Sequence, residues 1–376
     1  MPTFPTEVFE HIISFVWPDR RTLIACSLTC RAWLPRSRSN LLYSIDLQTA
    51  KELRRFSRLI TAQPQLNDRI RELNIESKDG KLAGCFPLML ARKLTRVEHL
   101  RVYRPKDLRI FSQLFLTTMA AFTTITRLEL TAIMFPSITV FVCFVSSLPN
   151  LTDLICASVR WSNEASNLPQ YAHPGRRLKL RLIAFSFPMW STDFVACLLT
   201  IISLDDFYSL NLRKVYLKDM AFINQLLEAV GPSLRQLAIG YEAVEVEDAQ
   251  KLNLALTDQL EYIHLEFRAK GDWIYDALSE VAPTRVRQVT ICSCGKFGQA
   301  ELDRLLCDRI DKLLSQPKWA SLRHVVIAYF PHVPPKASNW LRSEIPRRFP
   351  TLWPRALVRV EQARGHWWKL DPVQEG

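Results

Sequence analysis

The chain has 376 residues, which exceeds the roughly 100–200 residues of an ordinary single domain, so it holds two domains or one small domain joined to a longer array. Its 48% apolar and 23% charged residues are typical of a folded chain and exclude a disordered one. The formal charge of +12 has two interpretations, an unevenly charged surface or attraction to an acidic partner, and Lys and Arg occur singly or in pairs, which argues against nucleic acid.

The cysteines and the first residues indicate an intracellular protein. The nine cysteines are odd in number, and several, such as Cys143 and Cys197, lie inside apolar runs where a free thiol behaves as a small hydrophobe. The first residues lack the basic-then-apolar order of a secretory signal. The longest apolar stretch, residues 133–148, is shorter than the ~20 residues that a spanning helix needs. We therefore expect a reducing location, the cytoplasm or the nucleus, and no membrane partner.

Residues 1–40 predict three short helices. Residues 4–16 carry apolar residues at helical spacing after Pro5, a proline in the position of a helix opener. Residues 22–28 and 30–34 form a second and a third apolar stretch. So few residues cannot bury all these side chains among themselves, so we expect a partner to cover the remainder. The alternative is a helical cap on the array that follows.

From residue 42 onward a six-residue pattern, apolar-x-x-apolar-x-apolar, recurs with a step of 22–36 residues. Its copies begin at Leu42, Ile70, Val97, Ile125, Leu151, Leu180, Leu212, Leu234, Leu260, Val286 and Leu322. The last apolar positions of each copy alternate with polar ones, as in a half-buried strand. Segments between the copies have helical spacing, and residues 223–230 end at a Gly-Pro stop signal. Each unit therefore predicts one strand and one helix.

Stacked units of this kind predict an α/β solenoid whose strands line a concave side, because each unit buries its apolar face against its neighbours. A doubly wound parallel sheet is the alternative. The steps of 32 and 36 residues before the copies at Leu212 and Leu322 predict inserted loops, near residues 203–209 and near 292–297 or 316–320. The expected domains are residues 1–45, 46–335 and 336–376, the last being an aromatic-rich segment that caps the array.

Residues that flank the buried strand positions are expected to point into the concave groove. The candidates for binding a substrate there are Arg101, Tyr103, Arg104, Tyr216, Lys218 and Tyr241. Arg and Tyr are enriched at interface hot spots, and a basic-aromatic patch suits an acidic or phosphorylated segment. For each of these residues, an ordinary solvated strand position is the alternative.

No arrangement of residues predicts catalysis. The G-x-S-x-G, P-loop and H-E-x-x-H patterns are missing from the sequence. The close cysteine pairs, Cys26 with Cys30 and Cys292 with Cys294, lack the second pair or the histidines of a zinc site. We expect no catalytic residues, no metal and no cofactor, and a protein that is not an enzyme.

The N-terminal residues also carry a family resemblance. Phe4-Pro5-x-Glu7-Val8-x-x-x-Ile12, followed by Leu23-x-x-Cys26 and Cys30-Arg31-x-Trp33, is similar to the F-box pattern of Leu-Pro-x-Glu, a central Leu, and Cys-Arg-x-Trp. The similarity covers about residues 3–45, with Phe4 where leucine is usual and Thr29 in place of the common valine. Together with the repeats, the chain resembles F-box proteins with degenerate leucine-rich repeats, a family with large fungal expansions.

The resemblance implies a substrate-recognition adaptor of a ubiquitin ligase with a leucine-rich-repeat horseshoe. The F-box would bind a Skp-type adaptor and, through it, a cullin scaffold that carries a RING protein, while the repeats hold a protein substrate. The residues that would face the adaptor, or support that face, are Phe4, Pro5, Val8, Ile12, Leu23 and Trp33. The main alternative is a scaffold that binds the adaptor without ubiquitination, and a weaker one is a nucleic-acid-binding repeat protein.

Overall fold

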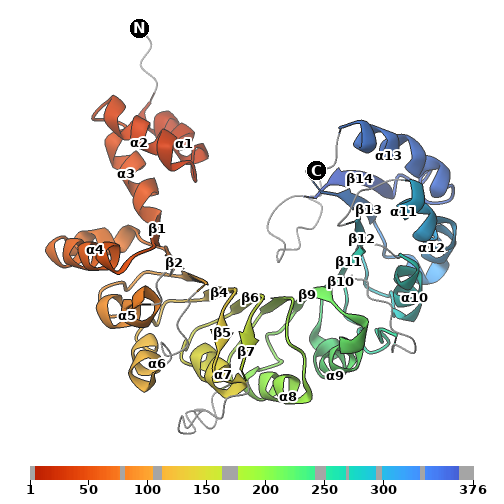
Figure 1. The fold of residues 1–376 in the computed structure, drawn as a ribbon. Coiled ribbons are helices and arrows are strands. Elements are labelled where there is room, and N and C mark those ends of the chain that lie inside the picture. The colour runs from red at the N-terminus through yellow and green to blue at the C-terminus, as the bar shows by residue number, and fades with distance from the viewer. Residues whose placement is uncertain are drawn as a thin grey trace. The chain divides into compact units, whose positions relative to one another are not determined.

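The computed structural model describes residues 5–76, 81–104, 112–162, 177–241, 251–267, 271–293, 299–330 and 335–363. The chain divides into two compact units, the first made of residues 1–151 and 159–174 and the second of residues 152–158 and 175–376. Both units are mixed α/β with parallel strands (Figure 1). The expected three-part division therefore differs from the observed one, in which the helical residues at the N-terminus belong to the first unit.

The first unit opens with three helices, α1 (Thr6–Phe15), α2 (Arg20–Thr29) and α3 (Leu34–Tyr43). The side chain of Asp19 caps α2 by accepting hydrogen bonds from the backbone of Arg21 and Thr22, at 3.0 and 3.3 Å. Three short helices are as predicted, except that the third begins at Leu34, where the predicted stretch ends. No linker separates α3 from the first strand, which starts at the next residue.

The strands of the first unit follow one another in parallel and in chain order. They are β1 (Ser44–Leu47), β2 (Glu72–Glu76), β3 (His99–Tyr103) and β4 (Arg127–Thr131), with a separate small pair of β5 (Met134–Phe135) and β7 (Arg160–Trp161). Between them lie α4 (Ala50–Ala62), α5 (Lys81–Leu90) and α6 (Gln113–Met119), and α7 (Ile138–Ser146) follows β5. Figure 1 shows α4 to α6 along the same side of these strands.

The second unit repeats the arrangement. Its parallel strands, in chain order, are β6 (Asp153–Ala157), β8 (Leu182–Ser186), β9 (Ser209–Val215), β10 (Gln236–Tyr241), β11 (Tyr262–Phe267), β12 (Gln288–Ser293), β13 (His324–Tyr329) and β14 (Val358–Gln362). Its α-helices are α8 (Thr192–Ile201), α9 (Met220–Val230), α10 (Asp272–Glu280), α11 (Gln299–Arg304), α12 (Cys307–Leu314) and α13 (Pro335–Arg348). Among the described strands of each unit, the order does not reverse along the chain, as it would in a doubly wound sheet.

The core of each repeat lies between the strand and the helix that follows it. Helix α4 illustrates why: Thr49 and Glu52 form a capping box at its start, and Leu53 and Ile60 on one face are buried. On the strands, every second residue is buried against the helices, as Leu100 and Val102 are on β3. The opposite face of the strands carries polar residues on β2 to β4, such as Arg101, and both polar and apolar ones in the second unit, where Ile155 and Ala184 are buried on it.

The predicted repeat at Leu212 is wrong in register. In the sheet, Leu210 pairs with both Ile183 of β8 and Leu237 of β10, so the repeat begins at Phe207, which is buried. Ile183 to Leu210 and Leu210 to Leu237 are then both steps of 27 residues. The loop expected near residues 203–209 is therefore not an insertion, because these residues lead directly into β9.

The C-terminal segment contains a further strand–helix unit. Helix α13 leads to β14, and Val358 of β14 pairs in parallel with Val325 of β13. Buried Asp311 on α12 accepts hydrogen bonds from the backbone of Thr351 and Leu352, at 3.0 and 2.9 Å. This part of the expected cap, residues 336–376, is thus an additional repeat as far as residue 362, and residues 364–376 lie outside the described ranges.

Candidate interaction surfaces

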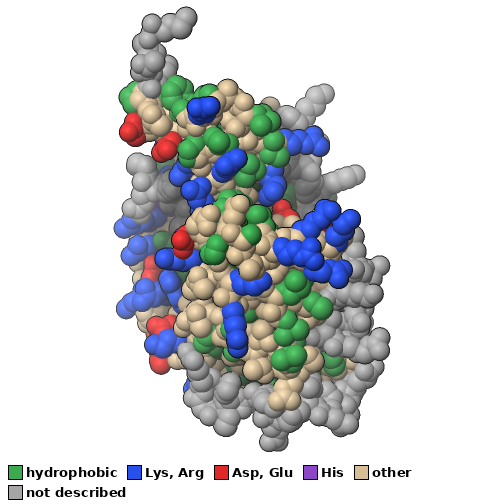
Figure 2. All heavy atoms as spheres, turned by 90° about the vertical axis from the view of Figure 1, so that its left-hand side faces the viewer, with side chains coloured by type: hydrophobic (Ala, Val, Ile, Leu, Met, Phe, Trp, Pro, Cys, Tyr) green, Lys and Arg blue, Asp and Glu red, His purple; other side chains and the backbone are tan. Residues whose placement is uncertain are grey.

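Large apolar side chains are exposed on α1 and α2. Ile12, Phe15 and Leu28 are 53%, 76% and 81% exposed, and Val8 and Ile24 are exposed as well. Spacings of three and four residues place the members on one face of each helix, so we call them the apolar rows of α1 (Val8, Ile12 and Phe15) and α2 (Ile24 and Leu28). Figure 2 shows hydrophobic side chains on the surface of this helical module. Burial of one such side chain contributes about 1.5–3 kcal/mol, which makes the rows a candidate docking surface.

The three helices are held together by a small internal core and a few polar contacts. Leu23 and Ile13 are buried at 1% exposure, and the rings of Phe9 and Trp33 pack with their centroids 5.7 Å apart. The guanidinium of Arg36 donates to the hydroxyl of Ser14 at 2.7 and 2.9 Å. These contacts use one side of each helix, so the apolar rows remain exposed without disturbing the module.

The predicted adaptor-binding residues divide into exposed and internal ones. Val8 and Ile12 are exposed, and Pro5 is the exposed N-cap of α1. Leu23 is buried and so can only support the surface, and Trp33 is half-buried against Phe9. Phe4 lies outside the described residues.

The most exposed residues, Phe15 and Leu28, were not among the predicted ones. The helical spacing from Ile12 to Phe15 and from Ile24 to Leu28 was the signal that could have found them. The F-box pattern identifies positions by residue type, whereas the exposure of a side chain depends on which face of its helix turns inward.

Below the helical module, α4 presents a basic face. Lys51, Arg54, Arg55 and Arg58 are all exposed, while Leu53, Phe56 and Ile60 of the same helix are buried. Figure 2 shows Lys and Arg side chains on the surface below the hydrophobic ones. Part of the chain's net positive charge therefore lies on α4, a helix of the first unit that follows the helical module in the sequence.

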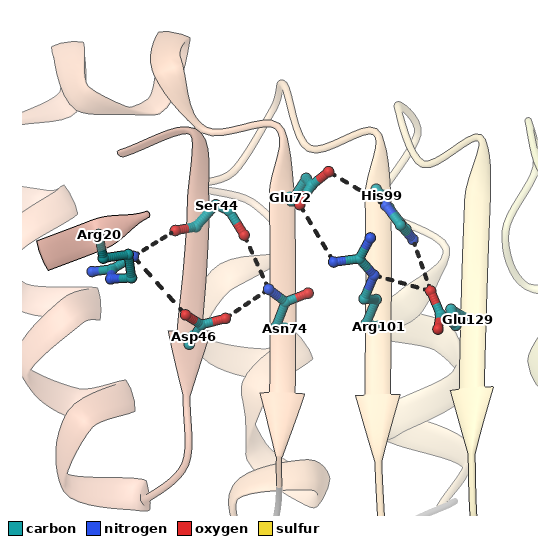
Figure 3. A network of polar contacts seen from close by, with 8 residues as sticks. All are labelled: Arg20, Ser44, Asp46, Glu72, Asn74, His99, Arg101 and Glu129. Carbon is teal, nitrogen blue, oxygen red and sulfur yellow. Dashed lines mark hydrogen bonds and ion pairs between the residues drawn. The ribbon is translucent and has the colours of Figure 1, made fainter. Parts of the chain in front are cut away.

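A polar network crosses the open face of β1 to β4 (Figure 3). Arg101 on β3 lies between two carboxylates, 3.5 Å from Glu72 on β2 and 3.0 Å from Glu129 on β4. His99 also lies between them, 3.6 Å from each. These residues are partly or fully buried, so they interact more strongly than exposed ion pairs do.

The network continues to β1 and reaches the helical module. Asn74 on β2 donates to the hydroxyl of Ser44 at 3.0 Å and to the carboxylate of Asp46 at 2.7 Å. Arg20, the first residue of α2, donates to the carbonyl oxygen of Ser44 at 3.1 Å and lies 3.9 Å from Asp46. The start of α2 is thereby attached to the first strand, as Figure 3 shows.

The carboxylates of Glu72 and Glu129 are held in the ionised state. Burial raises the pKa of Glu129, but the interaction with His99 and the charge of Arg101 outweigh it and lower the pKa below its ordinary value. Glu72 behaves in the same way, with the same two partners. For the neighbouring Tyr103, burial and then the charge of Glu129 raise the pKa to about 12.

The expected basic patch is not present around Arg101. Its guanidinium is compensated by Glu72 and Glu129, so it offers no free positive charge to an acidic segment. Tyr103 lies on the same face and is half-buried. Arg104 is exposed, but it has a φ of 47° at the end of β3, where its backbone donates to the carbonyl of Thr131. Of the three candidates in the first unit, only Arg104 has the exposed side chain that binding a substrate requires.

The other three candidates belong to the second unit. Lys218 is exposed, and its amine lies 5.6 Å from the ring centroid of the half-buried Tyr216. For Tyr241 the expectation of a groove-facing side chain is wrong, because it is only 8% exposed. Its hydroxyl contacts the sulfur of Met220 at 3.2 Å, and its ring packs edge-on against Trp273.

The second unit has a buried ion pair on the polar face of its strands. Arg213 on β9 and Glu266 on β11 are 3.1 Å apart across the intervening strand β10. Gly240 of β10 makes room for this contact, since a Cβ atom there would lie 3.2 Å from the Cβ of Glu266. Beside the pair, burial and then the charge of Arg213 lower the pKa of His264 to about 3, so this imidazole is neutral.

The described residues contain neither a metal-binding cluster nor a membrane-spanning helix. Among them, no group of three or more His, Cys, Asp or Glu side chains is arranged to hold a metal ion. Within the same ranges, no helix combines the length and the apolar composition that crossing a bilayer requires.

Comparison with known proteins gives no direct assignment. No family model matches the chain, and the search of curated proteins found no match. The function therefore has to be inferred from the surfaces described above.

Proposed function

We propose that this chain is an F-box adaptor with repeats of the leucine-rich type, which recruits a protein substrate to a Skp–cullin–F-box ubiquitin ligase. The observation that carries the proposal is the pair of apolar rows on α1 and α2. They are exposed on a three-helix module whose sequence resembles an F-box. A partner that covers Ile12, Phe15 and Leu28 would bury the surface that the module leaves open.

The parallel strand–helix units support the second half of the proposal. Strands in chain order, a step of 26–29 residues between most neighbours, and a helix after most strands are features of leucine-rich repeats. We propose that these units form a solenoid, or horseshoe, whose strand face binds the substrate. Apart from Arg101, whose charge is compensated, the predicted contact residues Arg104 and Lys218 are exposed and Tyr103 and Tyr216 are half-buried.

The proposed mechanism needs no chemistry on this chain. A substrate held by the repeats and a ubiquitin-conjugating enzyme carried by the cullin scaffold would meet at high effective concentration. The contacts of Arg20 with Ser44 and Asp46 support such a role, because they limit movement of α2 against the first strand. The proposal places this activity in the cytoplasm or the nucleus.

The apolar rows can be tested by truncating their most exposed members. We expect Phe15→Ala and Leu28→Ala each to weaken binding of a Skp-type adaptor by about 2 kcal/mol, or roughly 30-fold, as for interface hot spots. Affinity would be measured by calorimetry with the purified adaptor. Both side chains are exposed, so the free energy of unfolding should change little.

Leu114→Ala provides the matched control, because Leu114 is 61% exposed on α6, outside the helical module. It should leave adaptor binding unchanged. Equal binding by the wild type and by the double variant of Phe15 and Leu28 would exclude the proposed docking surface.

A second measurement separates a ligase adaptor from a scaffold. The full chain and its adaptor are mixed with a cullin–RING complex. Ubiquitin transfer to the proteins bound to the chain is then measured. Transfer that is lost with Phe15→Ala supports the adaptor. A ternary complex that assembles without any transfer would favour the scaffold.

A further inference from the structure

An open groove of about 470 Å³ lies at the start of β12 and β13 in the second unit. Arg285, Arg287 and Arg323 line it, together with one carboxylate, Glu261. Arg287 and Arg323 each stand directly before a strand, and the carbonyl oxygen of Arg287 accepts a hydrogen bond from the backbone of Arg323 at 2.8 Å. The pairing of β12 with β13 sets these two residues side by side, roughly 4.8 Å apart at Cα.

A hydrogen bond joins the two segments that line the groove. The hydroxyl of Ser321 donates to the carbonyl oxygen of Thr284 at 2.8 Å and connects the segments that precede β12 and β13. Arg285 directly follows Thr284 in the sequence. The groove is thus built by two connected segments and is not a gap between unrelated loops.

Charged or aromatic residues also stand directly before other strands of the unit, and there they interact with one another. The guanidinium of Arg181, before β8, lies 5.4 Å from the ring centroid of Tyr208, before β9. Arg235, before β10, forms an ion pair with Glu261 at 3.9 Å. The carboxylate in the groove is therefore already shared with an arginine outside it.

Arg285 and Arg287 differ from these neighbours. Both are exposed, and within the described ranges neither side chain forms a hydrogen bond or an ion pair. Arg323 adds a third positive charge to the same rim. Like charges held this close repel one another, and an anion placed between them would remove the repulsion.

We propose that this groove binds a phosphate monoester dianion. The planar forks of Arg285 and Arg287 match the geometry of phosphate oxygens, and two negative charges balance two arginines that lack a partner. The volume exceeds that of a phosphate group, which leaves room for the group that the phosphate is attached to. The site shares no residue with the apolar rows of α1 and α2, so phosphate binding can be tested independently of adaptor binding.

The proposal predicts saturable binding of inorganic phosphate to the full chain at constant ionic strength. Calorimetry would measure it, with chloride replacing phosphate in the reference solution. Arg285→Gln and Arg287→Gln should each weaken binding about tenfold, because each removes a charge-assisted hydrogen bond. The double variant should show no saturable binding.

Arg181→Gln is the matched control, since it removes an exposed arginine from the equivalent position before β8. It should keep phosphate affinity within about twofold. The melting temperature of each variant without phosphate should equal that of the wild type, which separates loss of binding from loss of folding.

A phosphoserine peptide and its unphosphorylated form, titrated into the same proteins, identify the source of the phosphate. Tighter binding of the phosphopeptide than of inorganic phosphate supports a phosphorylated side chain as the ligand. Equal affinities support free phosphate. No saturable binding of either probe by the wild type, or undiminished binding by the folded double variant, would overturn the proposal.

Discussion

At the scale of single residues, Arg101 shows how a neighbouring strand can change the role of a side chain. Its position between two buried apolar residues places it on the polar face of β3, as the sequence predicted. Its partners, Glu72 and Glu129, come from repeats 27 residues or more away in the sequence. The repeat pattern alone predicts the face but not the cross-strand contacts, so it could not reveal that the charge is compensated.

Removing this compensation should destabilise the first unit. We expect Arg101→Leu to lower the free energy of unfolding by about 1–3 kcal/mol, because it leaves two largely buried carboxylates facing each other. Urea denaturation would measure the change. Arg96→Leu is the matched control, since Arg96 and its partner Asp68 are mostly exposed, and it should cost at most about 1 kcal/mol. Equal effects of the two substitutions would contradict a structural role for the network.

The same network predicts acid sensitivity. The pKa values of Glu72 and Glu129 are lowered in the folded state, so their contribution to stability is fully present above the ordinary value of 4.5. It is lost as the pH falls below 4.5 through the lowered values. The free energy of unfolding of the first unit should therefore decrease over this range, as measured by urea denaturation at several pH values. In Glu129→Gln the dependence should be shallower, and an unchanged slope would exclude Glu129 as a contributor.

The prediction that Tyr241 points into the groove is wrong for a simple geometric reason. It lies two residues after Ile239 on a strand, and residues two apart point to the same face. Phe267 and Tyr329 stand at the same position of β11 and β13 and are buried too. The strands are longer at this end than the six-residue motif, so their apolar set extends by one aromatic residue.

At the scale of elements, β9 shows where the repeat pattern becomes ambiguous. The residues from Phe207 and those from Leu212 both fit the motif, because Leu212 can be read as the last apolar position of one copy or as the first of the other. In the structure β9 is irregular at this point. Lys214 has a φ of 56°, and the register with β10 shifts between Ile239 and Tyr241, so Val215 continues the strand after one extra residue. The regular step of 27 residues was the signal that distinguishes the two.

The contact between α12 and the turn after α13 predicts that the last repeat depends on Asp311. We expect Asp311→Ala to lower the free energy of unfolding by about 1–3 kcal/mol, because the backbone donors of Thr351 and buried Leu352 lose the buried carboxylate that accepts from them. Chemical denaturation would measure it, together with proteolysis of residues 349–357. Asp308→Ala, an exposed change on the same helix, should cost about 0.5 kcal/mol. Proteolysis that remains as slow as in the wild type would contradict this account.

At the scale of the whole molecule, the strand–helix alternation and most of its register could be predicted from the sequence. Buried positions such as Leu73 and Leu128 recur at a nearly constant step, and the burial of apolar side chains fixes a period of this kind. The division into two compact units could not be predicted, because no change in composition marks it. The partners of charged strand residues, such as Arg101 and Arg213, also depend on cross-strand contacts that no local pattern records.

The attachment of α2 and α3 to the first repeat has a practical consequence for isolating substrates. Deleting residues 1–43 would remove the donor that Arg20 offers to Ser44, and also the carbonyl of Tyr43 that accepts from the backbone of Arg71 at 2.9 Å. β1 is the edge strand of its sheet, so the deletion would remove a contact to the backbone of that edge, and open edges favour aggregation. A substrate trap should therefore keep the full chain and carry Phe15→Ala with Leu28→Ala, so that captured proteins report on the repeats and not on a newly exposed edge.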